Sequence, residues 1–155
     1  PETRMQLKVL EQLRQRFDRV SSERLVSGPG LENIYWALCK IRGEPACDIT
    51  AAEVFSRVLA KEDPIAEEAT QLFFEALGQV AGNLALSLGA FDGMYLAGGI
   101  VKRYPDLLNS SGFRSGFENK GRHRPLMEKV PTLLILHPQP GLLGASYCAR
   151  ELFRQ

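Results

Sequence analysis

The sequence has no long apolar run, no excess of charge of either sign and no paired set of cysteines. No apolar stretch approaches the roughly 18 to 20 residues that a membrane-spanning helix needs. The first residues, Pro1 to Arg4, do not resemble a signal peptide. We therefore expect a cytoplasmic protein with no membrane partner.

The charge balance and the cysteines exclude further classes. The 19 Lys and Arg residues nearly match the 18 Asp and Glu residues, so we expect no nucleic-acid partner. The three cysteines, Cys39, Cys47 and Cys148, include no pair at CxxC spacing, which disfavours a disulfide framework and a zinc site. We expect free thiols that are at least partly buried, and we assign no metal site.

Several nucleotide and hydrolase motifs are also missing. The sequence contains no P-loop, no GxSxG elbow, no HExxH and no GxGxxG. Nucleotide binding therefore requires another arrangement of the backbone.

What is present fits one domain or one lobe of a larger enzyme, since 155 residues with 45% hydrophobic content can fill a core. The chain opens on Pro1 and enters a helical pattern at once, so we expect that further sequence precedes it. Apolar periodicity predicts helices over residues 3–17, 31–41, 51–60, 64–88, 104–108 and 142–153.

Two of these helices carry clear start signals. Thr50 is a candidate N-cap with Glu53 as its capping-box partner, and Asp63 precedes a proline at a first helical position. Gly78 and Gly82 lie inside the longest helix, which we expect to be largely buried. Because glycine costs about 1 kcal/mol there relative to alanine, we expect another backbone to pack closely against both.

Two apolar runs, residues 94–100 and 132–136, read as strands joined through helical material, which favours an α/β architecture. Two strands make an incomplete sheet, so the remaining strands should come from other chain. Residues 111–121 are polar and punctuated by glycine, and we expect a surface excursion there with Phe113 and Phe117 as its anchors.

The first strand ends in two glycines, Gly98 and Gly99. Backbone without side chains at the carboxyl end of a strand allows a ligand, often a nucleotide, to lie against the main chain. A strand that finishes in a tight turn has the same pattern. The following Lys102 and Arg103 are either phosphate contacts or a solvated pair at a helix start.

Glu23 lies at a corner between two helices, ahead of a Ser-Gly-Pro-Gly turn. A carboxylate in such a place can accept hydrogen bonds from paired hydroxyls of a sugar, or it can be a helix cap or a solvated charge. His123 and His137 have no acidic or cysteine partner at metal-ligand spacing, and we assign neither a role.

Taken together, five ordered blocks closely resemble the bacterial glucokinase family: residues 22–31, 83–89, 96–100, 113–122 and 137–144. Leu-Ala-Gly-Gly-Ile at 96–100 is shared with other sugar kinases. Phe-Glu-Asn-Lys-Gly-Arg at 117–122 and Pro-Gly-Leu-Leu-Gly at 140–144 point to this family.

The resemblance implies a fold and a set of binding residues. The chain is similar to the ribonuclease H-like carboxyl-terminal lobe of enzymes in the hexokinase and actin-like ATPase superfamily, as one domain over residues 1–155. Glu23 matches a glucose-binding glutamate. Gly28 lies in a turn on the nucleotide side of the cleft, and Gly98, Gly99 and Ile100 match the adenosine motif.

The resemblance also implies what the chain lacks. The family's Asn-Asp pair with the catalytic base, its phosphate-binding segments and its Glu-x-x-His sugar segment have no match, so no catalytic residue is assigned here. The implied reaction transfers the γ-phosphoryl group of ATP, with Mg²⁺, to the 6-hydroxyl of glucose. The expected partner is the missing amino-terminal part of the same protein.

Two alternatives stay open at this point. Related folds serve as sugar-responsive regulators without catalysis, and a helix-turn-helix upstream would favour that reading. The lobe's long apolar helix is also consistent with a role in homodimer formation.

Overall fold

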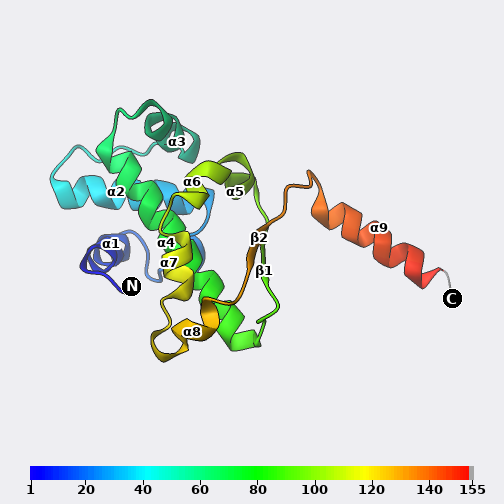
Figure 1. The fold of residues 1–155 in the computed structure, drawn as a ribbon. Helices are drawn as coiled ribbons and strands as arrows, with labels where there is room; N and C mark the ends of the chain where they lie inside the picture. The colour runs from blue at the N-terminus through cyan, green and yellow to red at the C-terminus, as the bar shows by residue number, and fades with distance from the viewer. Residues whose placement is uncertain (154–155) are drawn as a thin grey trace.

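The computed structural model describes residues 1–153, which form a helix-rich unit with one small sheet (Figure 1). The elements follow in the order α1 (Arg4–Arg14), the 3-10 helix η1 (Ser22–Arg24), α2 (Gly28–Arg42), α3 (Ala51–Ala60), α4 (Pro64–Leu88), β1 (Met94–Leu96), α5 (Gly99–Arg103), α6 (Pro105–Asn109), α7 (Phe113–Glu118), the 3-10 helix η2 (Gly121–His123), α8 (Arg124–Met127), β2 (Thr132–Leu134) and α9 (Pro140–Leu152).

The helix ends follow local sequence chemistry. The Thr50 side chain accepts from the backbone N–H of Glu53, whose carboxylate accepts in return from the Thr50 N–H, so the predicted capping box is confirmed. The Asp63 carboxylate accepts from the Ile65 N–H at 2.9 Å and begins α4, as predicted. Gly89, at φ 64°, ends the same helix in the left-handed conformation.

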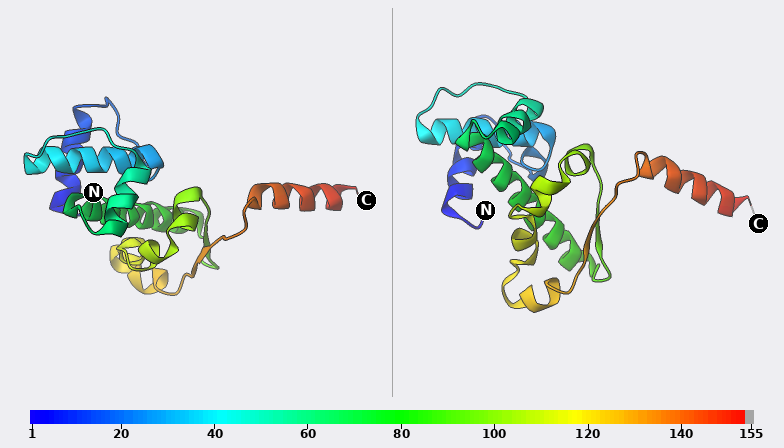
Figure 2. Two further views of the ribbon diagram at one scale, coloured as in Figure 1. Left: turned by 90° about the horizontal axis from the view of Figure 1, so that it is seen from above. Right: turned by 45° about the horizontal axis from the view of Figure 1, so that its top comes forward.

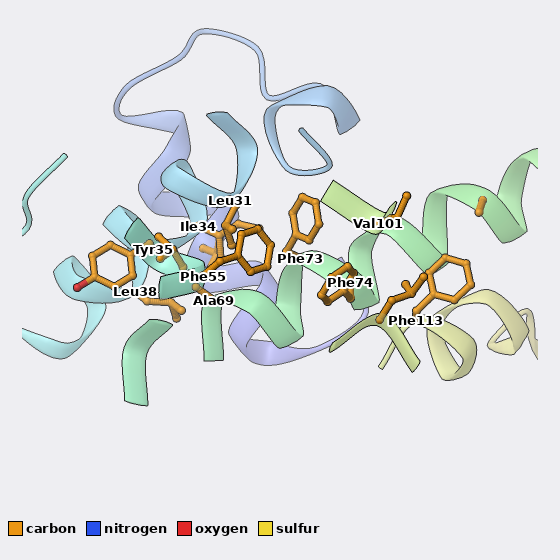
Figure 3. Close-up of a cluster of buried hydrophobic side chains, with 14 of the residues drawn as sticks. Leu31, Ile34, Tyr35, Leu38, Phe55, Ala69, Phe73, Phe74, Val101 and Phe113 are labelled. Atoms are coloured by element: carbon orange, nitrogen blue, oxygen red, sulfur yellow. The ribbon is translucent and has the colours of Figure 1, made fainter. Parts of the chain in front are cut away.

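Helix α4 is the centre of the structure, with α1, α2 and α3 packed on one side and α7 on another (Figure 1). Its Phe73 and Phe74 are in edge-on contact at 5.2 Å, and Phe74 lies near Phe55 of α3 (Figure 3). The prediction that the helix is largely buried is wrong for its last turns. Leu84 and Leu88 are 50% and 76% exposed, because none of the elements packed on α4 reaches that side of them.

Two glycines let α7 approach the backbone of α4. A Cβ on Gly78 would lie closer than 3.0 Å to the carbonyl group of Phe113, and one on Gly82 would clash with the carbonyl oxygen of Phe117. The predicted close packing at both positions is confirmed. A side chain at either position would force α4 and α7 apart.

Residues 111–121 are not simply a surface excursion, because they contain the helix α7. The two predicted anchors, Phe113 and Phe117, are buried, at 4% and 0% exposed. Gly116 serves packing, since a Cβ there would lie 2.5 Å from the Glu75 carbonyl oxygen.

The sheet consists of β1 and β2, paired in parallel with Tyr95 opposite Leu133. Helices α5 to α8 form the crossover that parallel strands require. Both strands are shorter than predicted, and Ile100 lies in α5, because the chain turns into a helix immediately after Gly98. The side chains of Tyr95 and Leu133 are 66% and 44% exposed, so one face of the two-stranded sheet is bare.

Helix α9 extends away from the rest of the structure in every view (Figures 1 and 2). It begins and ends near the predicted residues, but none of its residues is buried. Leu142, Leu143 and Tyr147 are each more than half exposed. A helix with apolar side chains on most of its surface is normally enclosed by other chain.

Candidate functional site

The corner between η1 and α2 is held by backbone contacts. Ser27 caps α2 by accepting from the Gly30 N–H at 3.1 Å, and its hydroxyl donates to the Glu23 carbonyl at 2.7 Å. A Cβ on Gly30 would lie 2.5 Å from the Leu25 carbonyl carbon, so only glycine allows this close turn. Asn33 of α2 donates to the Arg24 carbonyl at 3.1 Å. Residues 23–30 are therefore fixed as a unit.

This fixed corner presents the Glu23 carboxylate to solvent. The side chain is exposed, and no other described residue donates a hydrogen bond to its oxygens or pairs with its charge. It lines an open hollow of about 510 Å³ together with Arg19, Ser21, Arg24, Ser27, Pro29 and Asn33. An unsatisfied carboxylate on a rigid backbone, surrounded by polar groups, is suited to accept hydroxyl hydrogen bonds from a ligand.

The carboxyl end of β1 forms a second part of the site. Gly98 has φ 146° and leads directly into α5, a backbone conformation that glycine adopts freely. Gly98, Gly99 and Ile100 line a small cavity of about 150 Å³ with Val26, Phe73, Leu77, Leu96, Ala97 and Val101. The predicted strand end is thus an opening beside the corner.

A neighbouring cavity of about 260 Å³ brings Gly28 together with Gly99 and Ile100. It is completed by Ala51, Ala52, Phe55, Arg103 and Tyr104. A Cβ on Gly28 or on Gly99 would meet no atom within 4 Å, and neither residue has a left-handed φ. Neither packing within the described residues nor backbone strain requires glycine at these two positions, and both leave open space beside the main chain.

The corner between η1 and α2 lies between the hollow of Glu23 and the two cavities beside Gly99. Ser27 and Pro29 line the hollow of Glu23, whereas Val26 and Gly28 line the two cavities beside Gly99. Successive residues of one short segment thus face opposite sides. The structure brings Gly28, Gly99 and Ile100 into one cavity and leaves Glu23 in the adjoining hollow.

Several residues of the Gly28 cavity were not predicted from the sequence. The ring of Tyr104 stacks on Phe55 of α3, with centroids 4.0 Å apart and planes tilted by 23°. Ala51 and Ala52 supply only methyl groups to the same cavity. The sequence predicted the helix that contains Phe55 but gave no sign that α3 forms one wall of a cavity.

A hydrogen-bonded cluster fixes α3 against α2 and α4. The Tyr35 hydroxyl donates to the Asp63 carboxylate at 2.8 Å, and Arg57 donates to both groups. Burial acts to raise the pKa of Asp63, but hydrogen bonds from Tyr35, from the Ala66 N–H and from Arg57 outweigh it and hold that pKa below its usual range. Burial and the bond to Asp63 raise the pKa of the Tyr35 phenol.

The remaining candidate groups lie apart from the site. Within residues 1–153 no three His, Cys, Asp or Glu side chains come together as a metal site. Cys39 is buried, but Cys47 and Cys148 are exposed, so the prediction of at least partly buried thiols is wrong for these two. Both lie on segments with little packing around them. No helix of the described chain is long and apolar enough to cross a bilayer.

Comparison with known proteins gives one consistent family. The profile that describes glucokinases matches residues 1–152. A glucokinase of Cronobacter sakazakii is 45% identical over 147 residues, which are 95% of this chain and 46% of that protein. A glucokinase of Xanthomonas euvesicatoria is 43% identical over 155 residues, which are 100% of this chain and 46% of that protein.

Two solved structures of glucokinases resemble this chain in fold. The crystal structure of a glucokinase from an Antarctic psychrotroph matches with a TM-score of 0.91 and 31% identity, covering 97% of this chain and 47% of that one. A glucokinase of Balamuthia mandrillaris, solved with glucose, shares the fold with a TM-score of 0.66 at 23% identity. This chain spans about half the length of these relatives, consistent with the carboxyl-terminal lobe of a sugar kinase. The chain therefore belongs to the glucokinase family.

Proposed function

We propose that the protein containing this chain phosphorylates glucose with ATP, and that this chain supplies one side of the cleft. The observation that carries the proposal is the corner at residues 26–29. The free carboxylate of Glu23 lies in the hollow on one side of this corner. The cavity lined by Gly28 and Gly99 lies on the other side. A sugar hollow beside a nucleotide cavity is the arrangement that transfer between the two ligands requires.

Glu23 acts in this proposal by binding sugar hydroxyls and orienting the ring. It is not the base that removes the proton of the attacking hydroxyl, since no aspartate of this chain lines the same hollow. The base and the groups that hold the phosphates belong to the part of the protein that this chain does not include. Lobe closure over the hollow would exclude water, which competes with the sugar hydroxyl as a nucleophile.

The nucleotide side fits the base and ribose of ATP better than its phosphates. Gly28 and Gly99 leave the main chain open to a ligand, and the walls are mostly carbon. No carboxylate lines this cavity, so the residues described do not hold Mg²⁺ by themselves. We infer that Mg²⁺ enters with the phosphates and is held by the other half, as is usual for phosphoryl transfer.

The other half of the protein is also the partner that the bare surfaces require. Helix α9 and the exposed face around Tyr95 and Leu133 are apolar and uncovered in residues 1–153. The mid-helix Gly144 meets no atom within 4 Å where a Cβ would stand, whereas Gly78 and Gly82 of α4 each meet a packed backbone. This contrast supports packing of α9 against chain outside these residues.

Two further parts of the proposal stay predictions. A cytoplasmic location is one of them, which fractionation of cells would test. A homodimer is an alternative use of the bare surfaces, and a monomer by light scattering of the complete protein would count against it.

The proposal is tested by assaying glucose phosphorylation with ATP for the product of the complete reading frame, beside this 155-residue chain. Activity in the complete product alone is expected. Glucose binding by the complete product without phosphorylation would favour a sugar-responsive regulator instead.

A further inference from the structure

Two adjacent cations at the end of α5 differ in what they face. Arg103 lines the cavity that holds Gly28 and Gly99, whereas Lys102 is not among the residues that line it. Both side chains are exposed, and neither has an ion pair or side-chain hydrogen bond with another described residue. The sequence offered the two residues as an equivalent pair, and the structure separates them.

The position of Arg103 is fixed by its neighbours. The Tyr104 N–H donates to the Ile100 carbonyl at 3.0 Å, and the Tyr104 carbonyl accepts from the Leu108 N–H at 3.1 Å. The Tyr104 ring stacks on Phe55, which is 1% exposed. The backbone that carries Arg103 is therefore anchored to the core, and only the end of its side chain is free.

Arg103 is also the only charged residue among those that line this cavity in residues 1–153. The other lining residues are Gly28, Ala51, Ala52, Phe55, Gly99, Ile100 and Tyr104. Apart from the main-chain N–H groups at the starts of α2, α3 and α5, these walls are mostly carbon. A planar base suits them, and a guanidinium group stacks on aromatic planes as well as pairing with anions.

We propose that Arg103 is a nucleotide-binding residue that packs its guanidinium plane over the base of the phosphoryl donor, in the cavity of Gly28 and Gly99. This inference rests on the proposed function, since it assumes that the cavity takes a nucleotide. It adds a residue and a mode of contact, and it assigns Lys102 no contact with the ligand.

The test measures binding of ADP and of adenosine to the complete protein by calorimetry. Arg103→Ala should weaken both ligands by the same factor, about three- to tenfold, because both carry the base. Arg103→Lys keeps the charge but not the plane, so it should restore little of the loss. Lys102→Ala is the matched control and should bind both ligands as the unmodified protein does.

Three results would overturn the inference. Unchanged binding by Arg103→Ala removes the residue from the site. Loss of ADP binding alone, restored by Arg103→Lys, shows a phosphate contact instead of a stacked base. If the unmodified protein binds neither ADP nor adenosine, the proposed nucleotide cavity itself fails, and the inference fails with it.

Discussion

Gly78 of α4 lies directly against the carbonyl group of Phe113 in α7, so close that a Cβ at Gly78 would overlap the carbonyl oxygen. Gly82, one turn further along α4, stands in the same relation to Phe117. This contact fixes the helices that follow β1 against the core. It also separates glycines that serve packing from those that line the candidate site.

Gly78→Ala should lower the stability of the complete protein by about 2–3 kcal/mol, because the added methyl group forces two helix backbones apart. The measurement is the midpoint of urea unfolding, followed by circular dichroism. Ser87→Ala, at an exposed position of the same helix, is the internal comparison. An unchanged midpoint for Gly78→Ala would contradict the packing described here.

Gly99→Ala should weaken the use of ATP without lowering the stability of the protein. Its added methyl group meets no protein atom within 4 Å but enters the cavity shared with Gly28. We expect an unchanged unfolding midpoint and a KM for ATP raised about tenfold or more, as a ligand that loses its close approach loses about 1.4 kcal/mol or more. Steady-state kinetics at saturating glucose provide the measurement. A KM for ATP equal to that of the unmodified protein would show that no ligand lies against Gly99.

Glu23→Gln should weaken the use of glucose and leave nucleotide binding unchanged. A hydrogen bond to a charged group contributes about 1.5–3 kcal/mol, so kcat/KM for glucose should fall by about ten- to a hundredfold. Glu11→Gln, an exposed carboxylate on α1 outside both hollows, is the control. Unchanged sugar kinetics in Glu23→Gln would remove this residue from the site.

Asp63 should make the protein sensitive to acid. Because its folded pKa lies below the ordinary value, its contribution to stability is present above about pH 4 and is lost as pH falls through the folded pKa. Asp63→Ala, which also removes the cap of α4, should cost about 1–2 kcal/mol at neutral pH. The difference in unfolding midpoint between variant and parent should shrink below about pH 4. A difference independent of pH would contradict this role for the carboxylate.

The sequence predicted those features that depend on neighbours along the chain. The cap at Thr50, the start at Asp63 and the end at Gly89 each follow from contacts within one helical turn. The two apolar strands joined through helices were also predicted, but their parallel pairing was not.

The sequence did not predict features that depend on distant contacts. Residues 111–121 were read as a surface excursion because they are polar and punctuated by glycine, and only the approach of Glu75 explains Gly116 as a packing residue. The exposure of Leu84 and Leu88 likewise depends on where other elements end.

In the candidate site, too, some features could be predicted from the sequence and others required the fold. The sequence pattern offered Glu23, Gly98 and Gly99 as candidates beside structural alternatives. The resemblance gave them their roles and added Gly28 and Ile100, and the ligand contacts of all five stay predictions. The cavity that joins Gly28 with Gly99 became visible only with the fold. The difference between Arg103 and Lys102 could not be read from two adjacent positive charges, since it depends on which side of α5 faces α3.

The most direct test of the account is hydrogen exchange of the complete protein with each ligand alone. The central claim is that the corner at residues 26–29 divides a sugar hollow from a nucleotide cavity. Glucose should slow amide exchange in residues 21–27, and ADP should slow it in residues 97–104. Protection of neither segment, or protection of residues 97–104 by glucose and of residues 21–27 by ADP, would contradict the account.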